Sequence, residues 1–62
     1  MDQPPELLTI DEVAEWLRVS VPSVRRLQQG RYIPFIKIGG SVRFAKEDVV
    51  QYLKKMRIEA MR

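Results

Sequence analysis

The 62-residue sequence contains no cysteine and no histidine, so it lacks the side chains on which much protein chemistry depends. Without cysteine there are no disulfides and no thiolate zinc sites to stabilise a small fold. Without histidine, the commonest general base and the commonest transition-metal ligand are missing too. A chain this short also has little room for a pocket that excludes water. We therefore expect no enzyme activity, no metal, no cofactor and no small-molecule substrate.

Long apolar runs are absent as well, since no segment approaches the ~20 apolar residues needed to span a bilayer. The opening residues, Met-Asp-Gln-Pro-Pro-Glu, have neither the basic nor the apolar region of a signal peptide. Together with the missing cysteines, this favours a cytoplasmic location and no membrane partner. The composition, 45% hydrophobic and 31% charged, is normal for a globular chain, and the length suits one domain.

Acidic residues are missing from the middle of the chain. Residues 18–43 contain six cations and no Asp or Glu, whereas residues 1–17 contain five acids and no Lys or Arg. The two signs normally intersperse on a surface whose only task is solubility. A face with cations alone suits a polyanion, because neutralising phosphates releases condensed counterions. Solubility remains an alternative, and so does a protein-interaction module that docks an acidic partner through this basic face.

The N-terminal third predicts an extended lead-in followed by a helix. Residues 1–8 contain a Pro-Pro pair and are expected to form an extended lead-in to the folded domain, which spans residues 9–62. Thr9 and Glu12 have the spacing of a capping box, and the apolar residues that follow recur at helical spacing. A helix is predicted over residues 10–17, and Trp16 beside its apolar stripe is predicted to pack in the core.

A second helix is predicted after a short break. Ser20 can cap it, Pro22 suits its first turn, and Gly30 after Gln29 is expected to stop it in a left-handed conformation. Val19, between the two helices, is expected to fill the core at the turn. Two short helices joined by about three residues form a helix-turn-helix candidate.

The outward face of this second helix follows from a rotation of about 100° per residue. The buried arc centres on Val24, and the opposite face carries arginines and neutral polar residues that can reach base edges or phosphates. The predicted contact residues of the recognition helix are Pro22, Ser23, Arg25, Arg26 and Gln29.

Residues 35–44 change to a strand pattern. Two β-branched and aromatic runs, 35–38 and 42–44, flank a Gly-Gly pair, which is typical of a tight hairpin turn with positive φ. Backbone amides at a tip without side chains can approach phosphates closely. The predicted contacts of this wing and its flanks are Arg31, Lys37, Gly39, Gly40, Ser41 and Arg43.

A last helix is predicted from about Lys46 to Met61, with acids in its first turn and cations later, as the helix dipole favours. Its expected inward stripe is Val49, Val50, Leu53 and Met56, and Phe44 and Tyr52 are expected to line the core. The fold class is therefore mainly α with a small β-hairpin, in the order helix, turn, helix, hairpin, helix.

Taken together, these segments resemble the excisionase-type helix-turn-helix family and, more distantly, the N-terminal domain of MerR-type regulators. The resemblance covers residues 8–54. It depends on Leu8-Thr9, Val13-Ala14, Leu17, Val19-Ser20, Val24-Arg25-Arg26-Leu27, Gly30, Ile33-Pro34, Lys37-Ile38-Gly39, Arg43-Phe44 and Asp48-Val49 through Tyr52-Leu53.

The resemblance implies a winged helix-turn-helix that binds double-stranded DNA, with the second helix in the major groove and the hairpin on the flanking backbone or minor groove. Members include excisionases, which are architectural factors in site-specific recombination, and small transcriptional regulators. An integrase or recombinase, or further copies of the chain on DNA, would be the protein partners. Arg18 occupies a turn position that is often glycine in such proteins.

Overall fold

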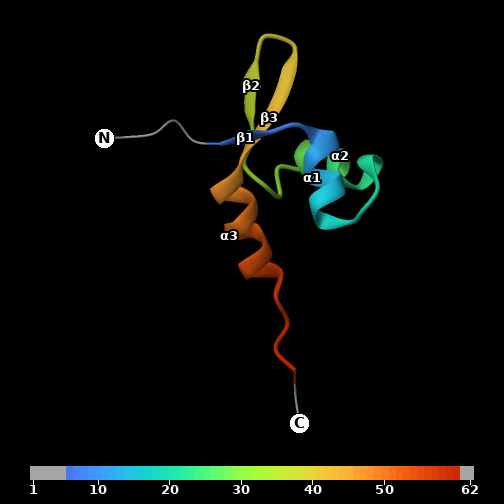
Figure 1. Cartoon of the computed structure of the whole chain (residues 1–62), viewed down its shortest axis with the longest axis vertical. Helices are drawn as coiled ribbons and strands as arrows, with labels where there is room; N and C mark the ends of the chain where they lie inside the picture. The colour runs from blue at the N-terminus through green and yellow to red at the C-terminus, as the bar shows by residue number, and fades with distance from the viewer. Residues whose placement is uncertain (1–5, 61–62) are drawn as a thin grey trace, which may run out of the picture.

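The computed structural model describes residues 6–60, which fold into three helices and a small three-stranded antiparallel sheet (Figure 1). The helices α1 and α2 lie side by side, the β2–β3 hairpin projects at one end of the molecule, and α3 lies at the other. This is the predicted class, a mainly α helix-turn-helix with a β-hairpin. The elements are β1 (Leu7–Leu8), α1 (Ile10–Leu17), α2 (Val21–Gln29), β2 (Ile36–Ile38), β3 (Ser41–Ala45) and α3 (Lys46–Met56).

The capping box that the sequence predicted starts α1. The Thr9 hydroxyl accepts from the Glu12 amide at 3.1 Å, and the Glu12 carboxylate accepts from the Thr9 amide at 2.9 Å. The helix ends where Arg18 adopts a left-handed conformation with φ 59, and the Val19 amide donates to the Ala14 carbonyl at 3.0 Å. The Thr9 and Glu12 amides at the start of α1 and the Ala14 carbonyl at its end, which have no partner within the helix, are thereby satisfied.

Ser20 caps α2 as predicted, since its hydroxyl accepts from the Ser23 amide at 3.3 Å. The expected role of Gly30 is wrong. Gly30 has a right-handed φ of −82, and Arg31, with φ 59, is the left-handed residue instead. The Tyr32 amide donates to the Leu27 carbonyl at 2.9 Å, so the left-handed residue lies one position after the glycine, although α2 ends at Gln29 as predicted.

The sheet has the strand order β1–β3–β2. Ile38 pairs with Ser41 across the hairpin, and Gly39 between them has the positive φ, 58, that a two-residue turn needs at its first central position. On the other edge, Leu7 pairs with Ala45 and Leu8 with Phe44. The sequence did not predict this third strand. Its two residues, Leu7 and Leu8, are too few to show the alternation of apolar and polar residues that marks a strand.

The core lies where α1, α2, β3 and α3 meet. Phe44, predicted to line it, is completely buried, and Tyr52 packs against it half-buried. Two predictions are wrong: Val19 is 44% exposed and Trp16 is 42% exposed. Val19 lies in the turn between α1 and α2 and borders an open cleft, and the Trp16 ring lies on the surface next to the ammonium group of Lys46. The buried core residues are Val13, Ala14, Val24, Ile33, Phe44 and Val49.

The last helix is shorter than predicted. It ends at Met56, and Arg57 continues in an extended conformation, with φ −68 and ψ 132, while Met61 lies outside the described residues. Val49 is buried as expected, but Leu53 and Met56, predicted to face inward, are exposed. Short helices depend on packing of an apolar face for most of their stability. Residues 57–60, which follow Met56, are all exposed and therefore gain no such packing.

Within residues 6–60, no helix combines the length and apolar character needed to cross a membrane, and no three carboxylates converge as a metal site would need.

Candidate nucleic-acid interface

The outward face of α2 is solvent-exposed where the helical periodicity predicted it. Arg25, Arg26, Pro22 and Gln29 are all exposed, while Val24 on the opposite side is 1% exposed and anchors the helix to the core. Arg25 and Arg26 lie on different sides of this face, because neighbouring helical residues are rotated by about 100°. A helix that presents two guanidinium groups in this way can offer one to a groove and the other to its edge.

Ser23 is half-buried, and its hydroxyl already has partners within the protein. Its oxygen lies 2.9 Å from the Ser20 hydroxyl, and the Arg26 Nη2 donates to it at 3.4 Å. The three side chains therefore form a chain of hydrogen bonds along one side of α2, from the N-cap to the guanidinium. Ser23 was predicted to contact DNA. Its hydrogen bond to the Arg26 guanidinium also orients that side chain.

The hairpin places its two predicted cations on opposite faces of the sheet. Lys37 pairs with Val42, whereas Arg43 pairs with Ile36, and paired residues share a face while successive residues alternate. Lys37 is exposed, but Arg43 is half-buried and its Nη1 donates to the Val42 carbonyl at 2.8 Å. Lys37 is consequently the freer of the two for an external anion.

The tip of the hairpin is open on all sides. Gly39, Gly40 and Ser41 are exposed, and no atom lies within 4 Å of where a Cβ would stand on either glycine. Arg31, at the C-terminal end of α2, is exposed too. The structure thus places every predicted contact residue at or near the surface. Their contacts with DNA stay a prediction.

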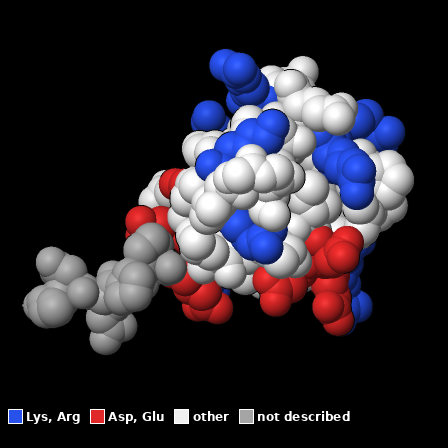
Figure 2. Space-filling view, turned by 90° about the horizontal axis from the view of Figure 1, so that it is seen from above, with Lys and Arg blue, Asp and Glu red and all other residues white. Residues whose placement is uncertain are grey.

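Charge is separated over the molecular surface. In the view from above, lysines and arginines cover the centre and the upper side, and acids gather along the lower rim (Figure 2). Among residues 6–60 the ion pairs join Lys46 to Glu6 at 3.7 Å and Arg57 to Glu59 at 3.6 Å. These pairs use none of the cations of α2 or of the hairpin, so the positive field of the predicted interface is not neutralised by them.

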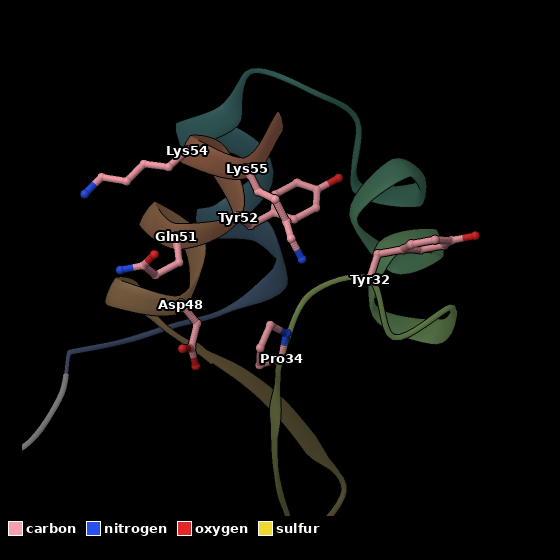
Figure 3. A pocket seen from close by; sticks show the side chains of 7 residues that line it. All are labelled: Tyr32, Pro34, Asp48, Gln51, Tyr52, Lys54 and Lys55. Carbon is pink, nitrogen blue, oxygen red and sulfur yellow. The ribbon is translucent and has the colours of Figure 1, made fainter. Parts of the chain in front are cut away.

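A cleft beside the interface was not predicted from the sequence. Its polar end, of about 500 Å³, lies between the segment after α2 and the outer face of α3 (Figure 3). No sequence signal marks it, because its two walls come from segments about twenty residues apart. We call it the α2–α3 cleft. The side chains at its polar end are Tyr32, Pro34, Asp48, Gln51, Tyr52, Lys54 and Lys55.

Comparison with protein families gives one result. A family model described as a helix-turn-helix domain matches residues 7–57, which is most of the chain and includes every helix and strand. Neither the curated proteins nor the solved structures contain a match to this sequence.

Proposed function

The chain belongs to the helix-turn-helix domain family, whose members are DNA-binding domains, and from this premise we propose that it binds duplex DNA sequence-specifically. In this proposal α2 enters the major groove and the β2–β3 hairpin lies on the flanking backbone. The observation that carries it is the exposed face of α2, with two arginines and no acid, held in place by the buried Val24.

The roles of the α2 residues follow from their places on the helix. The major groove of B-form DNA is about 12 Å wide and admits an α-helix, and arginine is the side chain that most often recognises guanine there. Arg26, on the outermost face, is proposed to contact a base edge, with Pro22 and Gln29 beside it. Arg25 and Arg31, at the sides and the end of the helix, are proposed to contact phosphates.

The hairpin is proposed to bind the backbone next to the site that α2 occupies. Lys37 supplies the exposed charge, and the amides of Gly39 and Gly40 can approach a phosphate because no side chain separates them from it. Ser41 adds a hydroxyl at the tip. Arg43 contributes long-range charge while it stays hydrogen-bonded to its own strand.

The biological output that we propose is either architectural, in site-specific recombination together with an integrase or recombinase, or regulatory, in transcription. Both require the same DNA contacts and no catalysis, as the family is typically non-enzymatic. The two differ in what they do to DNA. An architectural factor bends its site, which changes the distance between dyes placed at the two ends of a short duplex. A simple repressor need only occupy it.

Salt dependence of binding tests the proposal directly. Fluorescence anisotropy with a labelled duplex would be recorded from low to moderate salt concentration. With about four to six phosphate contacts, the logarithm of the association constant should fall against the logarithm of salt with a slope of about −4 to −5. A slope near zero would contradict the proposed interface, since counterion release would then be absent.

A further inference from the structure

We propose that the α2–α3 cleft is a docking site for an amphipathic helix of a partner protein, with an apolar stripe flanked by carboxylates. Beyond the polar end shown in Figure 3, the cleft continues into an apolar part of about 580 Å³. Both parts share Tyr32 and Tyr52, so they adjoin. The other apolar side chains of this part are Leu17, Val19, Leu27, Leu53 and Met56.

The apolar part is exposed to an extent that a structural role does not require. Tyr32 is 68% exposed and Met56 is 51% exposed, although both carry large apolar surfaces. Contiguous exposed apolar surface on a small protein typically marks an interaction site. The chain itself does not cover this surface within residues 6–60, because residues 57–60 continue away from the globular body and Ile58 is 91% exposed (Figure 1).

The charges that line the cleft select the chemistry of the partner. Arg26 is the charged side chain of the apolar part, and Lys55 lines the adjoining hollow that shares Leu27, Tyr52 and Met56 with it. The lining of both has cations and no acid. Lys54 extends the positive edge toward the polar end, where Asp48 is the acid of the lining. Electrostatic complementarity across an interface favours a partner of opposite sign. An apolar surface edged by cations therefore suits an apolar stripe edged by carboxylates, and it repels a basic segment.

The shape of the cleft favours a helix over an extended strand. An extended peptide usually binds by adding to a free strand edge, whereas the walls of this cleft are α2, α3, the end of α1 with the turn that follows it, and the segment after α2. An amphipathic helix binds in such a groove through residues spaced at i, i+3 or i+4, and i+7. Leu27 on one wall and Leu53 on the other then contact opposite sides of one apolar stripe.

Two synthetic peptides of about 15 residues, long enough for partial helicity, provide the probe. Both carry the same leucine stripe, and the flanking positions are glutamate in one and lysine in the other. Each is titrated into the full chain without DNA, so the outcome does not depend on the proposed DNA binding. The glutamate peptide should shift the amide signals of residues 17–19, 27, 32 and 52–56 in NMR spectra. The lysine peptide should leave them unchanged.

Matched variants locate the binding site. Leu53→Ala should weaken the glutamate peptide about tenfold, as truncation of a central apolar contact does. Ile58→Ala removes an exposed apolar side chain outside the cleft and should leave binding unchanged. Lys55→Glu should weaken it by at least about threefold, whereas Lys37→Glu, on the hairpin, should not. These side chains are exposed, so circular dichroism should show that all four variants stay folded.

Three outcomes would overturn the proposal. Equal binding of both peptides would show that the cations of the cleft do not discriminate between acidic and basic partners. If the amide signals of the cleft residues did not shift, no acidic helix would dock there. If dilution of the protein alone shifted the same amide signals, the occupant would be a second copy of the chain. Failure of the peptides combined with a normal salt dependence on DNA would leave the proposed function intact, so the two proposals fail separately.

Discussion

Arg18 and Arg31 share one backbone conformation, φ 59 in both, and each closes a helix through the same pair of hydrogen bonds. The Arg18 amide donates to the Glu15 carbonyl and the next amide to the Ala14 carbonyl. After α2, the Arg31 amide donates to Gln28 and the next amide to Leu27. Both helices of the DNA-binding unit thus end in a Schellman motif with an arginine at the left-handed position that glycine usually occupies.

Replacing either arginine by glycine should stabilise the fold. A left-handed conformation costs a residue with a Cβ roughly 1 kcal/mol, and glycine adopts it without that cost. Part of the gain is offset because glycine has more freedom in the unfolded chain. Arg18→Gly and Arg31→Gly should each raise the free energy of unfolding in urea by about 0.5 kcal/mol. Arg25→Gly, in the middle of α2, should instead lower it by about 1 kcal/mol. Similar losses in all three variants would contradict this account.

The sequence predicted those features that are set by residues close together in the chain. The hydroxyls of Thr9 and Ser20 start the two helices, and the Gly39-Gly40 pair turns the hairpin, because each acts on its immediate neighbours. The exposure of Arg25 and Arg26 followed from helical rotation once Val24 was assigned to the core. The core role of Phe44 followed in the same way from the pattern of its strand.

Features that depend on distant packing were missed. Gly30 follows the last residue of α2 as expected, but the left-handed residue that closes the helix is Arg31, one position later. The short strand β1 exists only because β3 lies beside it. Trp16 was expected in the core, yet Lys46, thirty residues later, lies over its ring at 5.9 Å. The α2–α3 cleft likewise forms between segments that are distant in the sequence, so no local sequence pattern predicts it.

Removal of the Thr9 hydroxyl should destabilise the protein. Thr9→Ala leaves the Glu12 amide without its partner at the start of α1, and such changes cost about 1 kcal/mol. Thr9→Ser keeps an oxygen in the same place and should stay within about 0.5 kcal/mol of the parent protein. Urea unfolding followed by circular dichroism measures both. An equal loss in the serine variant would indicate that the methyl group matters more than the cap.

The two glycines of the hairpin should respond differently to alanine. Both positions have open space around a new Cβ, but only Gly39 has a positive φ, 58. Gly39→Ala should therefore lower the free energy of unfolding by about 1 kcal/mol, whereas Gly40→Ala should change it by less than about 0.5 kcal/mol. Thermal unfolding of the two variants under the same conditions checks this. A larger loss at Gly40 would contradict the turn geometry.

Loss of Lys37 should weaken binding to every duplex alike. A side chain that contacts the backbone carries no sequence information, so Lys37→Ala should reduce the magnitude of the salt slope by about 1 without changing sequence preference. Arg43→Ala should lower affinity less, because the Arg43 guanidinium is half-buried and hydrogen-bonded to the Val42 carbonyl. Anisotropy titrations on two unrelated duplexes measure both effects. The reverse order of the two variants would assign the wing contact to Arg43.

Ser23 should govern sequence preference through Arg26. In Ser23→Ala the backbone amide at position 23 keeps its bond to Ser20, so the helix cap persists, but the Arg26 guanidinium loses the hydroxyl that orients it. The number of cations is unchanged, and the salt slope should therefore match that of the parent protein. Selection from a random duplex library, followed by titration of the selected site, measures preference.

The ratio of affinities between the selected duplex and a random one should fall about threefold to tenfold in Ser23→Ala, because a guanidinium that is no longer fixed discriminates bases less well. Ser23→Thr retains the hydroxyl and should recover most of the ratio. Urea unfolding of the parent protein, Ser23→Ala and Ser23→Thr serves as the control. If all three are equally stable, a change in stability does not explain the change in sequence preference. Arg26→Ala should relax preference further and reduce the salt slope as well. An unchanged ratio in Ser23→Ala, with Arg26→Ala still impaired, would show that Arg26 finds its base without the serine.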